Sequence, residues 1–174
     1  MAKRLDEEDR HVRVRVDRVR LATGAAAAVA VLVAVAAAVA AGRDGGAPAV
    51  VVTDERGREL ASVPLPASGR FVLQYRHSVY RAEVSETFAA TGDRFRLVEV
   101  ASPSEAVLDY YELDGPRAAS GPGWRLEPAS TPAVAALPLV ATDVGRRTLV
   151  VGDRHIPLFT EGGAPAHLVL TVRR

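Results

Sequence analysis

The residues with the clearest potential for chemistry lie on two neighbouring predicted strands, one ending near His77 and a return strand containing Glu86. Side chains two residues apart share one face of a strand. The apolar face of the first strand consists of Phe71, Leu73 and Tyr75, and His77 continues it. Glu86 lies between two apolar residues on the matching face of the return strand. A carboxylate there is destabilising unless it has a partner. The pattern therefore predicts that His77 and Glu86 meet across the pair, about 5 Å apart if the register opposes them.

Two interpretations of this polar pair are open. One is a functional site at one end of a β domain: a ligand pocket, a metal site or an acid–base pair. The other is a structural hydrogen bond between His77 and Glu86 that holds the hairpin together. The hairpin residues that would belong to the site in either case are Tyr75, His77, Ser78, Tyr80, Glu83 and Glu86.

The spacing argues against a hydrolase and against a metal centre. Ser78 lies beside His77, but adjacent residues on a strand point to opposite faces, and no G-x-S-x-G turn surrounds the serine. No two histidines of the predicted β domain have the spacing of a metal motif. The candidate ligands would be His77, His155 and His167, with Glu83, Glu86 and Asp109 as carboxylates. We therefore expect a protein that is not an enzyme and has no metal or cofactor.

The elements that must position the hairpin are predicted to be strands. Short runs of alternating apolar and polar residues, bounded by Gly, Pro and Asp, are typical of an antiparallel β domain. Such runs cover residues 50–52, 58–62, 70–77, 80–89, 94–101, 139–142, 148–152, 155–159 and 167–172. Only residues 104–111 are compatible with a helix, and a strand suits them as well. We expect an all-β fold, either an antiparallel sandwich or a barrel.

The segment 114–138 is rich in Pro, Gly, Ser and Ala, and within it only residues 123–126 are predicted to be ordered. It is long for a loop in a compact domain. We therefore expect it to be either functional or mobile.

An uncharged segment that begins at Leu21 and ends at Ala41 precedes the β domain. Its 21 residues include 12 Ala, 5 Val and 2 Leu, and as a helix it would rise about 31 Å, which matches a bilayer core. Four arginines lie just before it and favour a cytoplasmic N-terminus. We expect a charged cytoplasmic tail at 1–20, a transmembrane anchor at 21–41, a linker at 42–48 and an extracytoplasmic β domain at 49–174.

Two alternatives to the anchor are open. Ala38, Val39 and Ala40 fit an A-x-A cleavage signal, so that cleavage near Ala40 would release a secreted domain. The segment is also rich in Ala, which contributes little insertion energy, so it could instead be a soluble helix.

Composition excludes several classes of function. The chain has 174 residues and no Cys, which excludes disulfides, thiolate metal ligands and a cysteine nucleophile. Its formal net charge is +1, and the predicted β domain carries 14 Arg against 15 Asp and Glu. This balance gives no electrostatic basis for binding nucleic acid.

The hairpin motif resembles the family called domain of unknown function 1850. The matching residues are Tyr75, His77, Ser78, Val79, Glu86 and Phe88. The likeness covers residues 49–172 and includes the Tyr110–Tyr111 pair, Gly123–Trp124 and the strands from Leu139 onward. The connection between the two strands departs from the family's pattern. Similar proteins often carry an acidic residue and a Pro there, where this chain has Tyr80 and Glu83.

Members of this family are small bacterial proteins, often encoded beside TRAP transporters of the TAXI class. The resemblance implies an accessory role in solute uptake, with TRAP transporter subunits as partners. The segment from Leu21 to Ala41 adds the bilayer of the bacterial cytoplasmic membrane as an expected partner. It implies no catalytic residue, because no reaction is established for the family. We therefore expect a membrane-anchored extracytoplasmic accessory protein or, alternatively, a small-ligand or ion-binding β domain that uses His77 and Glu86.

Overall fold

A computed structural model describes residues 47–174, which form the β domain. The cytoplasmic tail, the membrane anchor and most of the linker predicted above lie outside the described residues. Among residues 47–174, no helix combines the length and hydropathy that crossing a bilayer requires.

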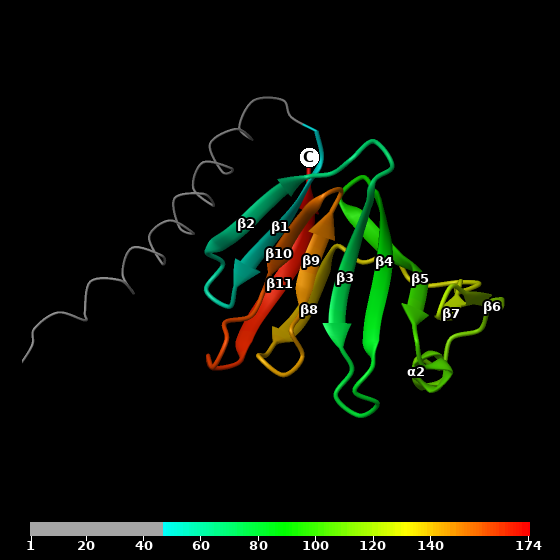
Figure 1. The fold of residues 1–174 in the computed structure, drawn as a ribbon. Helices are drawn as coiled ribbons and strands as arrows, with labels where there is room; N and C mark the ends of the chain where they lie inside the picture. Colours follow the sequence, from blue (N-terminus) through cyan, green and yellow to red (C-terminus); the bar gives the residue numbers. More distant parts are fainter. Residues whose placement is uncertain (1–46) are drawn as a thin grey trace, which may run out of the picture. The chain divides into compact units, whose positions relative to one another are not determined.

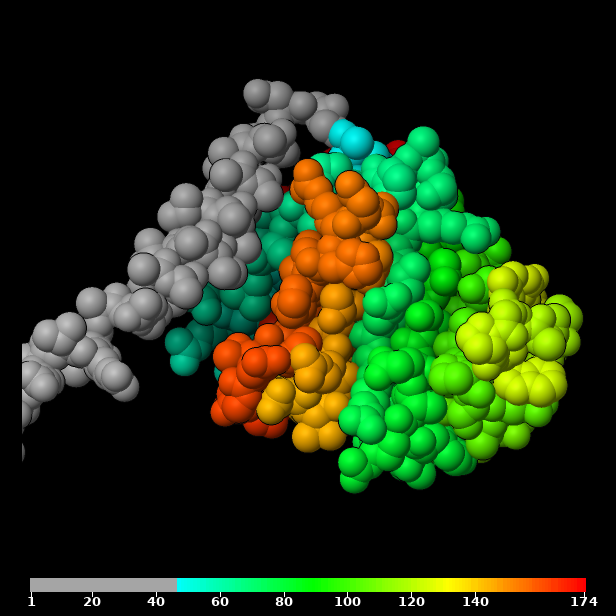
Figure 2. Space-filling view, in the orientation of Figure 1, coloured from blue at the N-terminus to red at the C-terminus, as the bar shows by residue number. Residues whose placement is uncertain are grey.

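Two antiparallel sheets make up the domain (Figure 1). The smaller sheet contains, in spatial order, β2 (Glu59–Pro64), β1 (Ala49–Asp54), β11 (Ala166–Arg173) and β8 (Ala136–Ala141). The larger sheet contains β10 (Arg154–Pro157), β9 (Thr148–Val151), β3 (Arg70–Arg76), β4 (Glu83–Thr91), β5 (Arg94–Ser102), β7 (Gly123–Leu126) and β6 (Arg117–Ser120). The short helix α2 (Glu105–Tyr110) follows β5. In the space-filling view, the β6–β7 hairpin forms the edge of the larger sheet (Figure 2).

The main hydrophobic core lies between the two sheets and contains inward residues from both. Its aromatic members Phe71, Phe88 and Phe95 have ring centroids 5.2 to 5.7 Å apart. A second, smaller core lies where α2 packs on the larger sheet, and its buried members are Val84, Val100, Val107, Leu108 and Leu126. Because two separate sheets share the main core, the all-β prediction is confirmed as a sandwich.

The structure corrects or completes the sequence-based predictions in three segments. Strand β4 begins at Glu83 and not at residue 80, because residues 77–82 form a turn closed by hydrogen bonds between His77 and Ala82 and between Arg81 and His77. The ambiguous segment 104–111 forms the helix α2. The segment 114–138 contains the β6–β7 hairpin, and Thr131 donates a 2.6 Å hydrogen bond to the Leu97 carbonyl, which ties this segment to β5.

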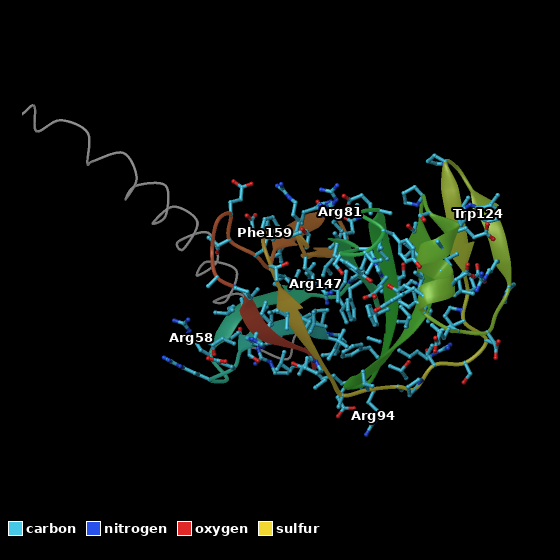
Figure 3. The ribbon with its side chains drawn as sticks, turned by 90° about the horizontal axis from the view of Figure 1, so that it is seen from below. Arg58, Arg81, Arg94, Trp124, Arg147 and Phe159 are labelled. Carbon is cyan, nitrogen blue, oxygen red and sulfur yellow. The ribbon has the colours of Figure 1, made fainter. Side chains whose placement is uncertain are left out.

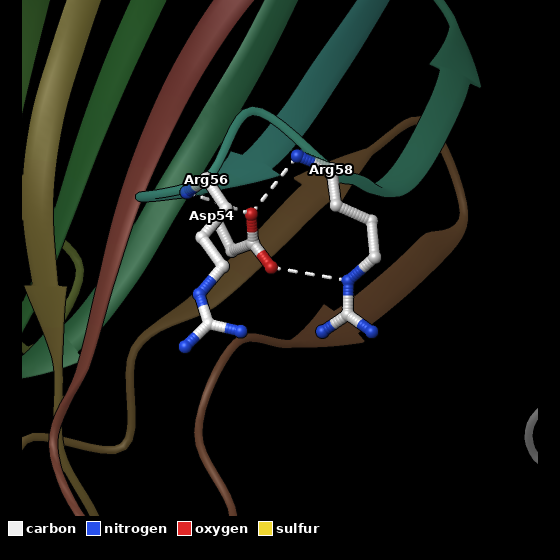
Figure 4. Close-up of polar contacts among 3 residues, drawn as sticks. All are labelled: Asp54, Arg56 and Arg58. Atoms are coloured by element: carbon white, nitrogen blue, oxygen red, sulfur yellow. Dashed lines mark hydrogen bonds and ion pairs between the residues drawn. The ribbon is translucent and has the colours of Figure 1, made fainter.

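The turn between β1 and β2 is organised by one carboxylate (Figure 4). Asp54 accepts hydrogen bonds from the backbone N–H groups of Arg56 at 3.0 Å and Arg58 at 2.9 Å, and from Arg58 Nε at 3.0 Å. These bonds, above all the one from the Arg58 backbone, lower the pKa of Asp54. The turn also contains Gly57 at a φ of 76°, a conformation that glycine adopts without strain.

Three connections meet at one end of the sandwich: the β3–β4 turn, the β8–β9 turn and helix α2 (Figure 1). The backbone N–H of Arg76, the last residue of β3, donates to the carbonyl of Gly145 in the β8–β9 turn at 2.8 Å. Ala49, where β1 begins, pairs with Arg173 near the C-terminus, and this pair lies at the opposite end of the sandwich (Figure 1).

Candidate functional site

Glu86 occupies the middle of an apolar row that crosses five strands of the larger sheet. The register pairs Glu86 with Leu73 on one side and with Val100 on the other. Leu149 and Leu126 extend the row outward. These four apolar neighbours have no solvent exposure, whereas Glu86 itself is partly buried. The strand pairing thus places Glu86 on the inward face, as the alternation of apolar and polar residues predicted.

Two tyrosine hydroxyls satisfy the Glu86 carboxylate. Oε1 of Glu86 accepts hydrogen bonds from the Tyr111 hydroxyl at 2.5 Å and from the Tyr75 hydroxyl at 3.2 Å. The two hydroxyls are also 2.7 Å apart. Tyr75 comes from β3, and Tyr111 is the C-cap residue of α2. We call Tyr75, Glu86 and Tyr111 the carboxylate network.

Burial and the adjacent carboxylate keep both tyrosines in their neutral, hydrogen-bond-donating form. Burial is the largest cause that raises the pKa of Tyr75 to about 12, followed by the charge of Glu86. The same two causes raise the pKa of Tyr111 further. The guanidinium carbon of Arg147 lies 4.7 Å from the centre of the Tyr75 ring, a distance typical of a cation–π contact. Arg147 is not among the site residues predicted from the sequence.

His77 does not pair with Glu86. The register puts Glu86 opposite Leu73, four positions before His77, and the side-chain hydrogen bonds of His77 lie within its own turn. Its Nδ1 accepts hydrogen bonds from the backbone N–H groups of Val79 at 3.2 Å and Tyr80 at 3.4 Å. The expected cross-strand pair is therefore replaced by a buried histidine, 6% exposed, that stabilises the β3–β4 turn.

An exposed aromatic surface surrounds His77. Its ring lies 5.2 Å from that of Tyr80 and 4.8 Å from that of Tyr110. Tyr80, Tyr110 and Val79 are 42%, 62% and 66% exposed. We call Val79, Tyr80 and Tyr110 the aromatic patch. Val144, 65% exposed, lies at the same end in the β8–β9 turn, so this end holds four of the five exposed large hydrophobic residues in the described part of the chain.

The other predicted site residues are not brought into either group. Ser78 is exposed, and the Nδ1 of its neighbour His77 already accepts two backbone N–H groups. Glu83 is exposed at the start of β4, opposite Arg76. Of the six predicted residues, Tyr75 and Glu86 thus share the carboxylate network, and His77 packs beneath Tyr80.

Within residues 47–174, no three His, Asp or Glu side chains are grouped as metal ligands would be. His155 lies on β10 and His167 on β11, while His77 lies in the β3–β4 turn. The described histidines are thus distributed over both sheets.

Comparison with known proteins gives no relative for the chain. No family model, curated protein or solved structure matches it. The resemblance noted from the hairpin motif therefore stays a prediction.

Proposed function

We propose that the chain is a non-catalytic, membrane-anchored extracytoplasmic accessory protein that binds a subunit of a TRAP-type solute transporter through the aromatic patch. The observation that carries the proposal is the exposure of Val79, Tyr80 and Tyr110 at one end of the domain. Tyrosine is enriched in the cores of protein interfaces, where its ring is buried and its hydroxyl can still find a partner. The transporter as partner rests on the hairpin resemblance.

The aromatic patch has features of a preorganised surface. His77 contacts both of its tyrosines and fixes the turn that holds Tyr80. A surface that is ordered before binding loses less conformational entropy when a partner docks. The patch therefore offers exposed apolar surface to a partner at a low cost in entropy.

Backbone strain is confined to the same end. In residues 47–174, the three non-glycine residues with positive φ are Arg81 at 55°, Glu112 at 52° and Arg146 at 47°. Arg81 follows Tyr80, Glu112 lies two residues after Tyr110, and Arg146 lies two after Val144. Such strain persists where surrounding contacts hold it, and it is concentrated at functional sites. It supports the proposal that this end, and not the sheet faces, meets the partner.

Co-purification of the full chain from gently solubilised membranes tests the proposal. A C-terminal tag suits this test, because Arg173 pairs with Ala49 at the end away from the patch. We expect a transporter subunit to co-purify with the unmodified chain at near-equal yield. The double variant Tyr80→Ser/Tyr110→Ser should lose this subunit. The control Val140→Ser should retain it, since Val140 is exposed on β8 and lies outside the patch. Recovery of the chain alone, or equal recovery of the subunit with both variants, would refute the proposal.

A further inference from the structure

Positive charge is concentrated at the end of the domain opposite the aromatic patch. The β2–β3 loop, the β4–β5 turn and the β9–β10 turn meet at this end (Figure 1). Gly69 of the β2–β3 loop accepts a hydrogen bond from the Ala90 N–H at 2.8 Å, and Val72 of β3 pairs with Val150 of β9. Five exposed arginines lie in or next to these connections, and we call them the basic end: Arg70, Arg94, Arg96, Arg154 and Arg174.

The strand register places two of these arginines side by side on the outer face of the larger sheet. Arg70 of β3 and Arg96 of β5 both pair with Ala89 of β4, so that one small residue separates them. Their neighbours Phe71 and Phe95 are buried in the main core. Since successive side chains of a strand point to opposite faces, Arg70 and Arg96 point outward.

The other three arginines extend the basic end around this pair. Arg94 follows the β4–β5 turn, and its side chain lies at the margin of the domain (Figure 3). Arg174 lies beside the same turn, since a Cβ atom added at Gly92 would be 3.8 Å from its Nη2. Arg154 begins β10, next to the strand β9 that pairs with β3. The basic end thus includes segments of both sheets.

Few acidic side chains oppose these arginines. The two acidic residues of the three connections are Asp93 and Asp153, which leaves a formal excess of three positive charges. Arg173 lies at the same end, but it is paired with Glu59 at 3.0 Å. The other residues of 49–174 carry nine arginines against thirteen acidic residues. The near-zero net charge of the domain is therefore the sum of a basic end and an acidic remainder.

This distribution of charge fits a flat anionic surface. A planar surface contacts one end of a domain, and charges further away than the Debye length of about 8 Å at physiological ionic strength are largely screened from it. A nucleic acid that wraps around the domain would meet the acidic remainder as well. The five exposed large hydrophobic residues of the described part of the chain lie elsewhere. Contact at the basic end would therefore be made by charge, without insertion of apolar side chains.

We propose that the basic end binds the anionic headgroups of a phospholipid bilayer. Arginine suits this contact, because its planar guanidinium group can donate two parallel hydrogen bonds to a phosphate. Each arginine near an anionic membrane strengthens binding by a factor of about five. The inference rests on the proposed function in one respect: the anchor would keep the domain beside a bilayer. It does not depend on the transporter partner.

Fluorescence energy transfer in lipid nanodiscs tests the inference with the full chain. The chain has no Cys, so Ala67→Cys places a single donor dye in the exposed β2–β3 loop at the basic end. Ser78→Cys places the same dye at the opposite end. The nanodiscs contain an acceptor-labelled lipid in phosphatidylcholine, either alone or mixed with phosphatidylglycerol. We expect phosphatidylglycerol to raise the transfer from position 67 and not from position 78. Salt at about 1 M should abolish this increase, because the Debye length falls to about 3 Å.

Two matched double variants test which arginines make the contact. Arg70→Ser/Arg96→Ser should weaken the contact about thirtyfold, the product of two factors of about five, and so remove the increase at position 67. Arg56→Ser/Arg81→Ser removes the same charge from two exposed residues elsewhere on the domain and should leave the increase intact.

Several results would overturn the inference. One is the same transfer from position 67 with and without phosphatidylglycerol, and another is an equal increase at positions 67 and 78. A third is an increase that Arg70→Ser/Arg96→Ser leaves unaltered. Binding of a labelled DNA duplex by a chain that does not respond to phosphatidylglycerol would assign the basic end to nucleic acid.

Failure of the anchor gives a different result from failure of this inference. A chain that does not enter nanodiscs contradicts the proposed anchor. That soluble chain should still sediment with phosphatidylglycerol vesicles and not with phosphatidylcholine vesicles. Sedimentation with neither kind of vesicle would refute the lipid contact as well.

Discussion

The Glu86 carboxylate accepts a hydrogen bond of 2.5 Å from the Tyr111 hydroxyl, 25 residues further along the chain. Tyr111 is the C-cap residue of α2, and Tyr110 before it belongs to the aromatic patch. The carboxylate network therefore links the interior of the larger sheet to the position of an exposed aromatic side chain.

Glu86→Ala should lower the free energy of unfolding by about 1 to 3 kcal/mol, because the Tyr75 and Tyr111 hydroxyls lose their shared acceptor and the 2.7 Å contact between them can replace only one of the two bonds. Tyr111→Phe, which removes one donor and keeps the ring, should cost about 1 kcal/mol. Denaturant unfolding of both variants and their double variant gives the coupling between the two residues. Glu105→Ala, an exposed carboxylate on α2, is the control. Unchanged stability in Glu86→Ala would exclude a structural role for the network.

The carboxylate network should also make the domain sensitive to alkaline pH. The pKa of Tyr75 is 10.0 in an ordinary environment and about 12 in the folded protein, because burial and Glu86 disfavour its anion. The folded state then holds this proton more tightly than the unfolded state does. Its stabilisation is complete below pH 10 and is lost as the pH rises towards 12.

Unfolding free energies measured across this pH range should fall more steeply for the unmodified chain than for Tyr75→Phe. Absorbance of the tyrosinate anion gives a second readout, since the last tyrosine protons to be released should include those of Tyr75 and Tyr111. A slope that Tyr75→Phe and Tyr111→Phe both leave unaltered would contradict this assignment.

Asp54 should contribute the opposite dependence on pH. Hydrogen bonds from the backbone of Arg58 and then Arg56, with the Arg58 side chain, lower its pKa below the ordinary 3.8. A lowered pKa in the folded state means that the stabilisation is present above about pH 3.8 and is lost as the pH falls through the folded value. Asp54→Asn should therefore flatten the acid limb of the stability curve. Asp93→Asn, in the turn between β4 and β5, should leave it unchanged.

Alternation predicted an all-β fold and the inward position of Glu86, because a period of two fixes which side chains share a face. It did not predict the partners of Glu86. These partners depend on the register between the strands and on how α2 packs against the sheet. The pattern of apolar and polar residues within a single strand determines neither. Tyr110 and Tyr111 are adjacent in the sequence, and the structure places Tyr110 in the aromatic patch and Tyr111 in the carboxylate network.

The prediction that His77 pairs with Glu86 is wrong for a specific reason. It assumed that the strand continues through His77, whereas β3 ends at Arg76. Once the chain leaves the strand, the period of two no longer fixes the direction of a side chain. The backbone hydrogen bonds between His77 and residues 81 and 82 then determine its place. In many turns, the side chain of Asp, Asn or Ser accepts a hydrogen bond from a backbone N–H two or three residues further along the chain. In this turn the acceptor is a histidine.

The two parts of the His77 side chain should prove separable by substitution. Its Nδ1 accepts the N–H groups of Val79 and Tyr80, and its ring packs against Tyr80 and Tyr110. His77→Asn keeps an acceptor near the Nδ1 position and removes the ring. His77→Phe keeps a ring and removes the acceptor. If the acceptor fixes the turn, His77→Phe should lose about 1 to 3 kcal/mol of stability, because two N–H groups lose their partner.

His77→Asn should by contrast preserve the turn and loosen the aromatic patch, since the tyrosines lose the ring between them. Hydrogen exchange of the Val79 and Tyr80 amides distinguishes the two effects: protection should survive in His77→Asn and fall in His77→Phe. Partner recovery should fall in both variants, because the patch needs its turn and its central ring together. Equal amide protection in the two variants would show that ring packing alone holds the turn, and the Nδ1 hydrogen bonds would then have no separate role.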